Sequence, residues 1–294
     1  MQYAIGAASS AIVVEAEPYE GQVTFENYLG HWKVISSFCI LSERSSGSNY
    51  LESLIKANLQ LPVAHNCPWK HEMEYDLAKF NPFADLDEDV LVVAIVRNAI
   101  DWVSSLYMQP YYAPSHCDAS FADFLTRPWT PGKVSESKAI GAIANSTYCA
   151  KTQSSHQEYE QKQGHYASSV LELRTWKLKR IRKLCNTRRQ ASCVRYEDLL
   201  ADPQRFLERL TERFHIKVKL GFFQEVTSYK GIEAPEHRSY KPSSEAQRLR
   251  GGYPSSLYNA TTLALLRHGL DLRFEASLDY FYDDIFRLYG LQRA

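Results

Sequence analysis

The segment VISSFCILSERSSGSNYLESLIKANL, residues 34–59, decides the fold that we predict for this chain. Residues 34–41 are largely apolar, and their composition indicates a buried strand. From about Ser48 onward, apolar residues recur every three to four positions, which is the period of a helix with one face in the core. A polar turn containing Gly47 joins the strand to the helix. The core-facing positions of the predicted helix are Leu51, Leu54, Ile55, Asn58 and Leu59.

Two further strands are predicted downstream, and each is followed by a helical pattern. Residues 89–96, DVLVVAIV, form an almost continuous aliphatic run, which suits a central parallel strand buried on both faces. Residues 191–196, ASCVRY, precede a helix that Asp202 can cap and that Pro203 can begin. Strands that alternate with helices predict a doubly wound, mostly parallel sheet in a single domain, residues 1–294. Ligands of such sheets bind beyond the carboxyl ends of the strands.

The composition is that of an ordinary globular protein, with 45% hydrophobic and 23% charged residues. The formal net charge is zero, so the overall field does not favour nucleic acid or an anionic membrane as a partner. No run of 18 apolar residues predicts a membrane span, and the short apolar stretch near the start lacks the basic segment of a secretory signal. None of the six cysteines forms a Cys-x-x-Cys pair or has zinc-ligand spacing. We therefore expect free thiols and a cytoplasmic protein.

Two polar segments interrupt the alternation of strands and helices. Residues 151–169 are poor in aliphatic side chains, which predicts a loop or a mobile lid. Residues 174–189 contain eight Lys or Arg residues and no acidic residue. An apolar stripe runs through the same stretch, which predicts an amphipathic helix. Its basic face is either solvated surface, the simpler interpretation, or a landing face for an anionic ligand.

The turn RSSGSN, residues 44–49, has the composition of an anion-binding site. Backbone N–H groups at a helix N-terminus carry partial positive charge, and an arginine beside them can bind two oxygens at once. The nucleoside-triphosphate loop needs a lysine directly after its last glycine, whereas the first lysine after Gly47 is Lys56. The motif therefore disfavours ATP and GTP, and the plain alternative is a polar turn that binds nothing. The candidate binding residues are Arg44, Ser45, Ser46, Gly47, Ser48 and Asn49.

A second candidate element is VRNAIDWVSSLY, residues 96–107, in which Ser105 follows Arg97 by eight positions. With this element the chain resembles the sulfotransferases that use 3′-phosphoadenosine 5′-phosphosulfate (PAPS). In that family a strand–loop–helix of the type Arg/Lys-Ser-Gly-Ser/Thr-Thr holds the 5′-phosphosulfate. A later arginine, with a serine eight residues on, holds the 3′-phosphate. Residues 44–49 are similar to the first element, and Arg97 with Ser105 matches the spacing of the second.

The resemblance extends over residues 34–215 in the order and spacing of its elements. VRYEDLLADPQRFLERL, residues 194–210, is similar to a third hallmark, in which the tyrosine, here Tyr196, lies near the adenine. Bacterial-type members read Glu-Arg-Asn-Ser-Gly-Thr-Asn-Tyr-Leu and carry Trp-Lys-His after the first helix. CPWKHEM, residues 67–73, supplies such a triplet in Trp69, Lys70 and His71.

The chain also departs from the family pattern. Arg44 lies three positions before Gly47 instead of two, so its contact with the ligand is shifted. Tyr50 stands where many members have tryptophan, and we expect its ring near the adenine. Asn98-Ala99 replaces the frequent Asn-Pro. The C-terminal Arg-Lys-Gly of cytosolic members is not recognisable, and residues 237–253 are the candidate replacement.

The resemblance implies an α/β, P-loop-like three-layer sandwich and transfer of a sulfuryl group from PAPS without a metal ion. The acceptor would be a hydroxyl or amine of a small-molecule natural product or a carbohydrate, and aromatic residues at 107–117 and 127–130 are candidates for its pocket. His71 suits the role of general base because its unperturbed pKa is near neutral. Lys70 suits stabilisation of the developing charge. Two alternatives stay open: an ATP-using, kinase-like P-loop transferase and a non-catalytic nucleotide-binding protein.

Overall fold

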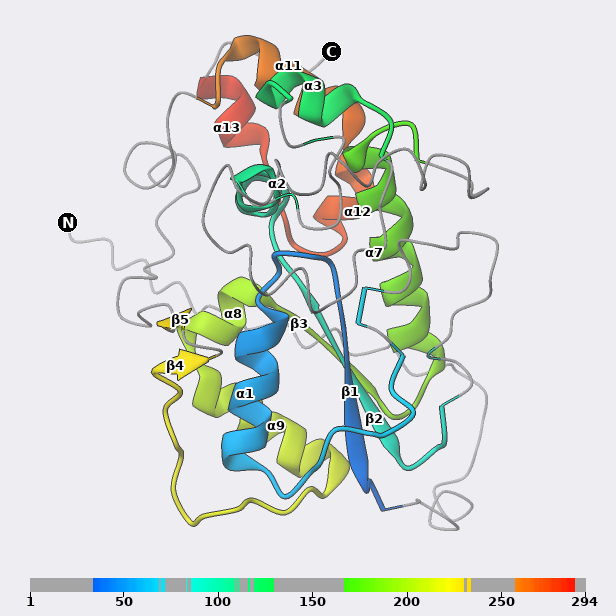
Figure 1. Ribbon diagram of the computed structural model, residues 1–294, viewed down its shortest axis with the longest axis vertical. Coiled ribbons are helices and arrows are strands. Elements are labelled where there is room, and N and C mark those ends of the chain that lie inside the picture. Colours follow the sequence, from blue (N-terminus) through cyan, green and yellow to red (C-terminus); the bar gives the residue numbers. More distant parts are fainter. Residues whose placement is uncertain are drawn as a thin grey trace, which may run out of the picture.

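A three-stranded parallel sheet lies at the centre of the computed structural model (Figure 1). Its strands are β1 (Ser37–Ser42), β2 (Val90–Val96) and β3 (Ala191–Arg195), in the order β1-β2-β3. All three run the same way, so their carboxyl ends meet at one edge of the sheet. The structure describes residues 34–68, 70–71, 83, 86–108, 110, 116, 119–129, 167–229, 232–233 and 257–288.

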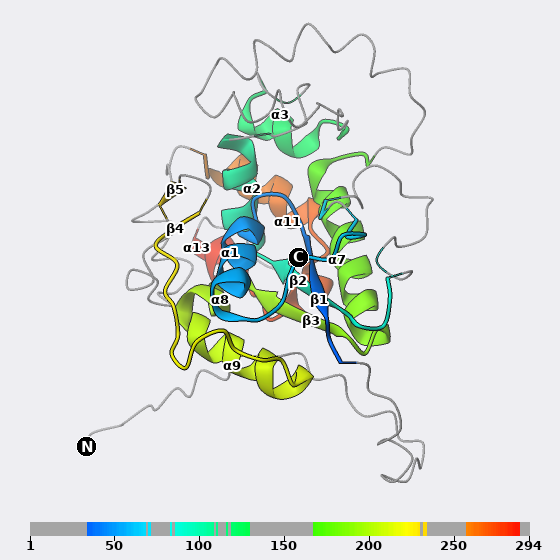
Figure 2. The ribbon, with the colours of Figure 1, turned by 60° about the horizontal axis from the view of Figure 1, so that its bottom comes forward.

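Helices cover both faces of this sheet. One layer contains α1 (Ser48–Asn58), α8 (Tyr196–Ala201) and α9 (Pro203–Phe214). The other contains α2 (Ala99–Met108), α3 (Phe121–Thr126), α7 (Val170–Thr187), α11 (Ala260–Gly269), α12 (Leu272–Ala276) and α13 (Asp283–Leu288). Figures 1 and 2 both place α7 on the side of the sheet opposite to α1 and α9. A two-stranded antiparallel ribbon, β4 (Ser228–Tyr229) and β5 (Ile232–Glu233), completes the described elements.

The pattern of burial in β2 explains why this strand is central. All seven of its residues are buried, and alternate side chains enter different cores. Val92 and Ala94 pack with the α2 and α7 layer, whereas Val93 and Ile95 pack with the α1 and α9 layer. A strand buried on both faces has no polar face, which is why its sequence reads as one aliphatic run. The predicted central parallel strand is confirmed.

The predicted helices of the described regions are also confirmed. The core-facing positions of α1 are all buried, as the spacing predicted. The carboxylate of Asp202 accepts a hydrogen bond from the N–H of Arg205 at 2.9 Å, and Pro203 begins α9. Of the predicted lid, residues 151–169, only 167–169 are described, and Ser169 caps α7. Trp69 and the C-terminal candidate, residues 237–253, lie outside the described residues. No helix in the described part of the chain is long and apolar enough to cross a membrane.

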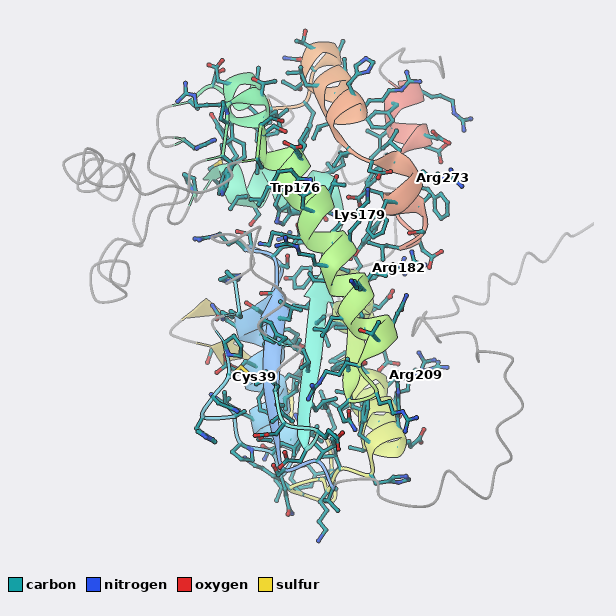
Figure 3. All side chains as sticks on the ribbon, turned by 90° about the vertical axis from the view of Figure 1, so that its right-hand side faces the viewer. Cys39, Trp176, Lys179, Arg182, Arg209 and Arg273 are labelled. Carbon is teal, nitrogen blue, oxygen red and sulfur yellow. A yellow bond between two sulfur atoms is a disulfide. The ribbon has the colours of Figure 1, made fainter. Side chains whose placement is uncertain are left out.

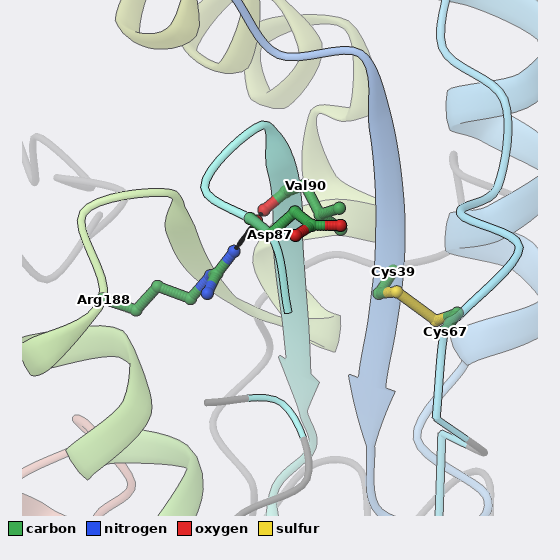
Figure 4. Close-up of a disulfide and its surroundings, with 5 residues drawn as sticks. All are labelled: Cys39, Cys67, Asp87, Val90 and Arg188. Atoms are coloured by element: carbon green, nitrogen blue, oxygen red, sulfur yellow. Dashed lines mark hydrogen bonds between the residues drawn. A yellow bond between two sulfur atoms is a disulfide. The ribbon is translucent and has the colours of Figure 1, made fainter. Parts of the chain in front are cut away.

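The expectation of free thiols is wrong for Cys39 and Cys67, which form a disulfide (Figure 4). Residues 62–64 run beside β1: Pro62 accepts a hydrogen bond from the N–H of Phe38, and the N–H of Ala64 donates to the carbonyl of Phe38. This pairing brings the two cysteine Cα atoms to 5.6 Å, a usual separation for a disulfide. No local pattern could predict this pair, because the two cysteines are 28 residues apart in the chain.

Arg188 fixes the other end of the sheet, where β2 begins (Figure 4). Its guanidinium donates to the carbonyls of Leu86, Asp87 and Val90 at 3.0, 2.5 and 2.9 Å. Because Arg188 directly follows α7, these bonds attach the end of that helix to the start of the central strand. One of the eight basic residues of the predicted helix therefore has a structural role.

Candidate functional site

The turn between β1 and α1 has a backbone that only certain residues accept. Ser45 and Gly47 are in the left-handed region, with φ values of 58° and 85°. A Cβ atom at position 47 would also lie 2.3 Å from Cε2 of Tyr196. Glycine is therefore required at this position both by the backbone and by the aromatic ring packed on it. The turn from β1 and the residue after β3 are thus in direct contact.

The N-terminus of α1 is left uncapped by side chains. Its N-cap residue is Gly47, which has no side chain to cap the helix, and its first turn contains no acidic residue. Five other described helices have a side-chain cap, and the capping residues are Ser120, Ser169, Asp202, Asn259 and Asp271. The first N–H groups of a helix need a partner and carry partial positive charge. In the five capped helices a side chain accepts a hydrogen bond from a first-turn N–H group, whereas at α1 an anion could take that place.

Arg97 reaches this turn from the end of β2. Its guanidinium donates to the carbonyl of Ser45 at 3.0 Å and lies 4.8 Å from the centre of the Tyr196 ring. The indole N–H of Trp102 donates to the carbonyl of Arg44 at 2.8 Å. Both bonds hold carbonyl oxygens of the turn toward β2 and α2. The structure thus brings together the predicted residues of all three strand ends.

Lys70 and His71 lie against the end of β1. The N–H of Ser42 donates to the carbonyl of Lys70 at 3.1 Å, which fixes this segment beside the end of β1. The Lys70 ammonium donates to the side-chain oxygen of Asn49, in the first turn of α1, at 2.5 Å. Nδ1 of His71 is 3.1 Å from the carbonyl of Ser42. The same nitrogen is 3.4 Å from the Ser42 hydroxyl. A carbonyl only accepts, so the shorter contact is a hydrogen bond in the tautomer that carries its proton on Nδ1, and Nε2 then has a lone pair.

A buried ion network lies beneath the turn, and the sequence analysis did not find it. We call Arg174, Glu43, Glu275 and Tyr282 the Arg174 network. Arg174 donates to Glu43 at 2.7 Å and to the two oxygens of Glu275 at 2.7 and 3.0 Å. It also donates to the carbonyl of Arg97 at 2.7 Å. One arginine of α7 therefore holds the residue before the turn, Glu43, and the residue that follows β2, Arg97.

The charge of Arg174 is fixed by its carboxylate partners. Its side chain is fully buried. Burial by itself would lower the pKa of Arg174, but the carboxylates of Glu275 and Glu43 raise this pKa well above its ordinary value. A sequence signal existed, because Arg174 falls on the apolar stripe with Leu171, Leu178 and Ile181. A charged residue at a core position of a helix needs a buried partner. The interpretation of the basic stretch as solvated surface is wrong for this residue.

A second buried cluster supports the start of α2. Glu197 accepts hydrogen bonds from the backbone N–H and the side-chain amide of Asn98 at 2.9 and 2.7 Å, and from the hydroxyl of Tyr280 at 2.8 Å. Asn98 also donates to Asp101 at 2.7 Å. Burial and the charge of Glu197 raise the pKa of Tyr280 well above its ordinary value. The cluster joins the ends of β2 and β3 directly beside Arg97.

Three predicted ligand contacts are placed differently from the rest. Tyr50 is fully buried in the core between α1 and the sheet. The side chain of Arg44 is also buried. Ser105 is half-buried on α2, and within the described residues no contact joins its hydroxyl to the turn. The proposed roles of these side chains toward a ligand stay predictions.

The aromatic residues near α2 and α3 form a packed cluster. Tyr107 meets Phe121 and Phe124 edge-on, with ring centres 5.1 and 5.4 Å apart. His116 lies 4.6 Å from the ring of Trp129 and is fully buried. Burial, with a smaller effect of the Arg127 charge, lowers the pKa of His116 to about 4. The described members of the predicted acceptor wall thus contribute to the core.

Comparisons of this chain with family models, with curated proteins and with solved structures find no match.

Proposed function

We propose that this chain is a sulfotransferase of P-loop-like α/β fold. It would move a sulfuryl group from PAPS to a hydroxyl or amine of a small-molecule natural product or a carbohydrate. The observation that carries the proposal is the uncapped N-terminus of α1, around which Arg97, Lys70 and Tyr196 gather. An anion site with a cation on each side and an aromatic ring beside it suits a nucleotide that carries separate anionic groups.

The turn suits the 5′-phosphosulfate. The left-handed residues Ser45 and Gly47 belong to the type of backbone that directs successive N–H groups toward an anion. The ammonium of Lys70 already lies at the first turn of α1 through Asn49. A sulfuryl group carries less charge than a phosphoryl group, so backbone N–H groups and one or two cations can hold this end of the donor.

Arg97 suits the 3′-phosphate, as the resemblance to the family implies. Its backbone carbonyl is held by Arg174, and its side chain is held against Ser45 and the Tyr196 ring. An arginine fixed in this way loses little side-chain entropy when it binds a phosphate through two hydrogen bonds. Tyr196 would then offer its ring to the adenine, a role that the family resemblance suggests.

His71 and Lys70 suit the chemistry of the transfer. PAPS supplies the sulfuryl group, and the acceptor must lose a proton as the new bond to sulfur forms. In the tautomer whose Nδ1 donates to the carbonyl of Ser42, Nε2 of His71 would accept that proton. The Lys70 ammonium would stabilise the negative charge that develops on the donor oxygens.

One feature favours the ATP-using alternative. Lys70 brings to the N-terminus of α1 the lysine that the turn itself lacks. A lysine in that position serves the terminal phosphates in nucleoside-triphosphate loops. The choice of nucleotide therefore separates the two functions.

Two measurements test the proposal. The product nucleotide, 3′,5′-adenosine bisphosphate (PAP), at a hundredfold excess over its dissociation constant should stabilise the folded protein by about 2.7 kcal/mol, and ATP with magnesium by much less. Labelled sulfate should then pass from PAPS to at least one member of a broad acceptor panel. Equal stabilisation by ATP would favour the kinase-like function. Binding of PAP without transfer to any acceptor would favour the non-catalytic protein.

A further inference from the structure

Three consecutive backbone groups follow β2, and each is held by a buried side chain from a distant part of the sequence. The groups are the carbonyl of Arg97 and the N–H groups of Asn98 and Ala99, the last being the first residue of α2. The side chains that hold them are, in the same order, Arg174, Glu197 and Tyr282. The three bonds measure 2.7, 2.9 and 2.9 Å. The peptide groups that orient the Arg97 side chain are therefore fixed from outside the strand.

Residues 275–282 contribute to all three of these contacts. Tyr282 makes one of them directly and donates its own hydrogen to Glu275 at 3.0 Å. Glu275 in turn binds the guanidinium of Arg174 at 2.7 and 3.0 Å. Tyr280 donates to the remaining side chain, a carboxylate of α8, at 2.8 Å. The turn after β2 thus depends on a segment near the C-terminal end of the chain.

This C-terminal segment is attached to α7. Figure 3 shows Lys179 and Arg182 on α7 beside α12, which carries Arg273. Lys179 pairs with Asp271, the N-cap residue of α12, at 2.7 Å. Arg182 donates to the carbonyl of Ser277, the C-cap residue, at 3.1 Å. These bonds attach both ends of α12 to the helix that also carries the arginine of the Arg174 network.

The side chain oriented by these contacts is that of Arg97. Its guanidinium lies at the turn before α1, where it donates to the carbonyl of Ser45 at 3.0 Å and lies 4.8 Å from the centre of the Tyr196 ring. A binding side chain contributes most to affinity when it is already held in the bound position, because little order must then be gained on binding. Any loosening of the peptide groups after β2 would reduce that advantage.

We propose that Tyr282 is a positioning residue of the nucleotide site and acts on the ligand through Arg97. The inference rests on the proposed function, because it takes Arg97 as the residue that binds the 3′-phosphate. Tyr280 has the same role one bond further away, through Glu197. The two tyrosines are 3% and 4% exposed, so they act without touching the nucleotide. Nucleotide affinity therefore depends on the packing of the C-terminal segment.

Tyr258 provides a matched control. It is also a buried tyrosine of the C-terminal part, and its hydroxyl donates to the carbonyl of Ile100 in α2 at 2.6 Å. Tyr258→Phe therefore removes a buried hydroxyl that is bonded to the backbone of α2, as Tyr282→Phe does. The carbonyl concerned lies one residue beyond Ala99 and is not one of the three groups that orient Arg97.

Calorimetric titration with PAP compares the variants, and circular dichroism checks that each is folded. Tyr282→Phe should weaken PAP binding about three- to tenfold, the usual range for one lost hydrogen bond, whereas Tyr258→Phe should change it less than about twofold. Adenosine 5′-phosphosulfate, which lacks the 3′-phosphate, should bind all of these proteins alike. Tyr280→Phe is the second variant, and it should weaken PAP binding more than Tyr258→Phe does.

A double-mutant cycle shows whether Tyr282 acts through Arg97. In an Arg97→Ala background, Tyr282→Phe should cause no further loss of PAP affinity, because the side chain that it positions is gone. A general structural defect would add to the loss caused by Arg97→Ala. The inference is overturned if the two losses add, or if Tyr258→Phe weakens PAP binding as much as Tyr282→Phe does.

A nuclear magnetic resonance spectrum of the arginine Nε–H groups tests the positioning role without a nucleotide. The Arg97 signal, identified by its loss in Arg97→Lys, should shift in Tyr282→Phe and stay in place in Tyr258→Phe. A signal that does not shift in Tyr282→Phe overturns the inference. Failure of the unaltered chain to bind PAP would instead refute the proposed function, and a shifted signal would still support the positioning of Arg97 by Tyr282.

Discussion

Two arginines meet at the end of β2, and their surroundings differ in kind. Arg97 donates to the backbone carbonyl of Ser45 and lies over the ring of Tyr196. Arg174 is fully buried and donates to two carboxylates, those of Glu43 and Glu275. The charge of Arg174 is neutralised within the fold by these carboxylates, whereas Arg97 lies at the turn itself, beside the N-terminus of α1. The buried Arg174 network stabilises the fold, whereas Arg97 belongs to the turn region that we propose for ligand binding.

The largest effect is expected at His71. Under the proposed function, His71→Ala should lower turnover by roughly 10²–10⁴-fold, the usual loss when a general base is removed. PAP affinity should stay nearly unchanged, because Lys70 and the turn remain. His65→Ala, an exposed histidine in the same segment, serves as the control and should have no effect on turnover. Near-normal turnover of His71→Ala would assign the proton transfer to another residue.

The next effect concerns the Arg174 network. Arg174→Met should reduce the free energy of unfolding by about 3–5 kcal/mol, because it leaves Glu43 and Glu275 buried without their cation. Lys179→Met, on the same helix but in an exposed pair with Asp271, should cost less than about 1 kcal/mol. Urea unfolding measures both. If the two substitutions reduce the free energy of unfolding equally, the stabilising role that we assign to the Arg174 network is wrong.

The free energy of unfolding should also depend on pH through the buried side chain of His116. Its pKa is lowered to about 4 by burial, so the folded state keeps it neutral while the unfolded chain protonates near pH 6.5. Its contribution is therefore complete above pH 6.5 and is lost as pH falls toward 4, up to about 3 kcal/mol. His116→Phe should show a shallower loss of stability over this range in urea titrations at several pH values. An unchanged slope would show that the ring is accessible to protons in the folded state.

The smallest of the four effects concerns Arg97. Arg97→Ala should weaken PAP by at least tenfold, since a hydrogen bond to a charged group is worth about 1.5–3 kcal/mol. Adenosine 5′-phosphosulfate, which lacks the 3′-phosphate, should bind the variant and the parent alike. Calorimetry with both nucleotides gives the comparison, and Ser105→Ala should show the same selectivity with a smaller loss. Equal weakening of the two nucleotides would contradict the assignment of Arg97 to the 3′-phosphate.

The local features of this fold were predictable from the sequence, whereas the contacts between distant elements were only partly so. Continuous apolar runs predicted β1 and β2, and the spacing of Leu51, Leu54 and Ile55 predicted α1. Lys70 and Asn49 were assigned to one site from the family resemblance, and the contact between them was found only in the structure. Partners such as Glu43 and Glu275 were missed because hydrophobic periodicity does not identify which carboxylate a buried arginine will meet.

The proposed site has a consequence for the order in which the chain folds. The bond from Arg97 to Ser45 spans 52 residues, that from Asn98 to Glu197 spans 99, and that from Arg174 to Glu43 spans 131. Contacts of such long range form only after large loops have closed, which makes them late and slow to appear. A nucleotide that needs all of these strand ends would therefore bind only to the fully assembled chain. Appearance of nucleotide binding during refolding would then time the completion of the fold, and a fragment of the chain would show none.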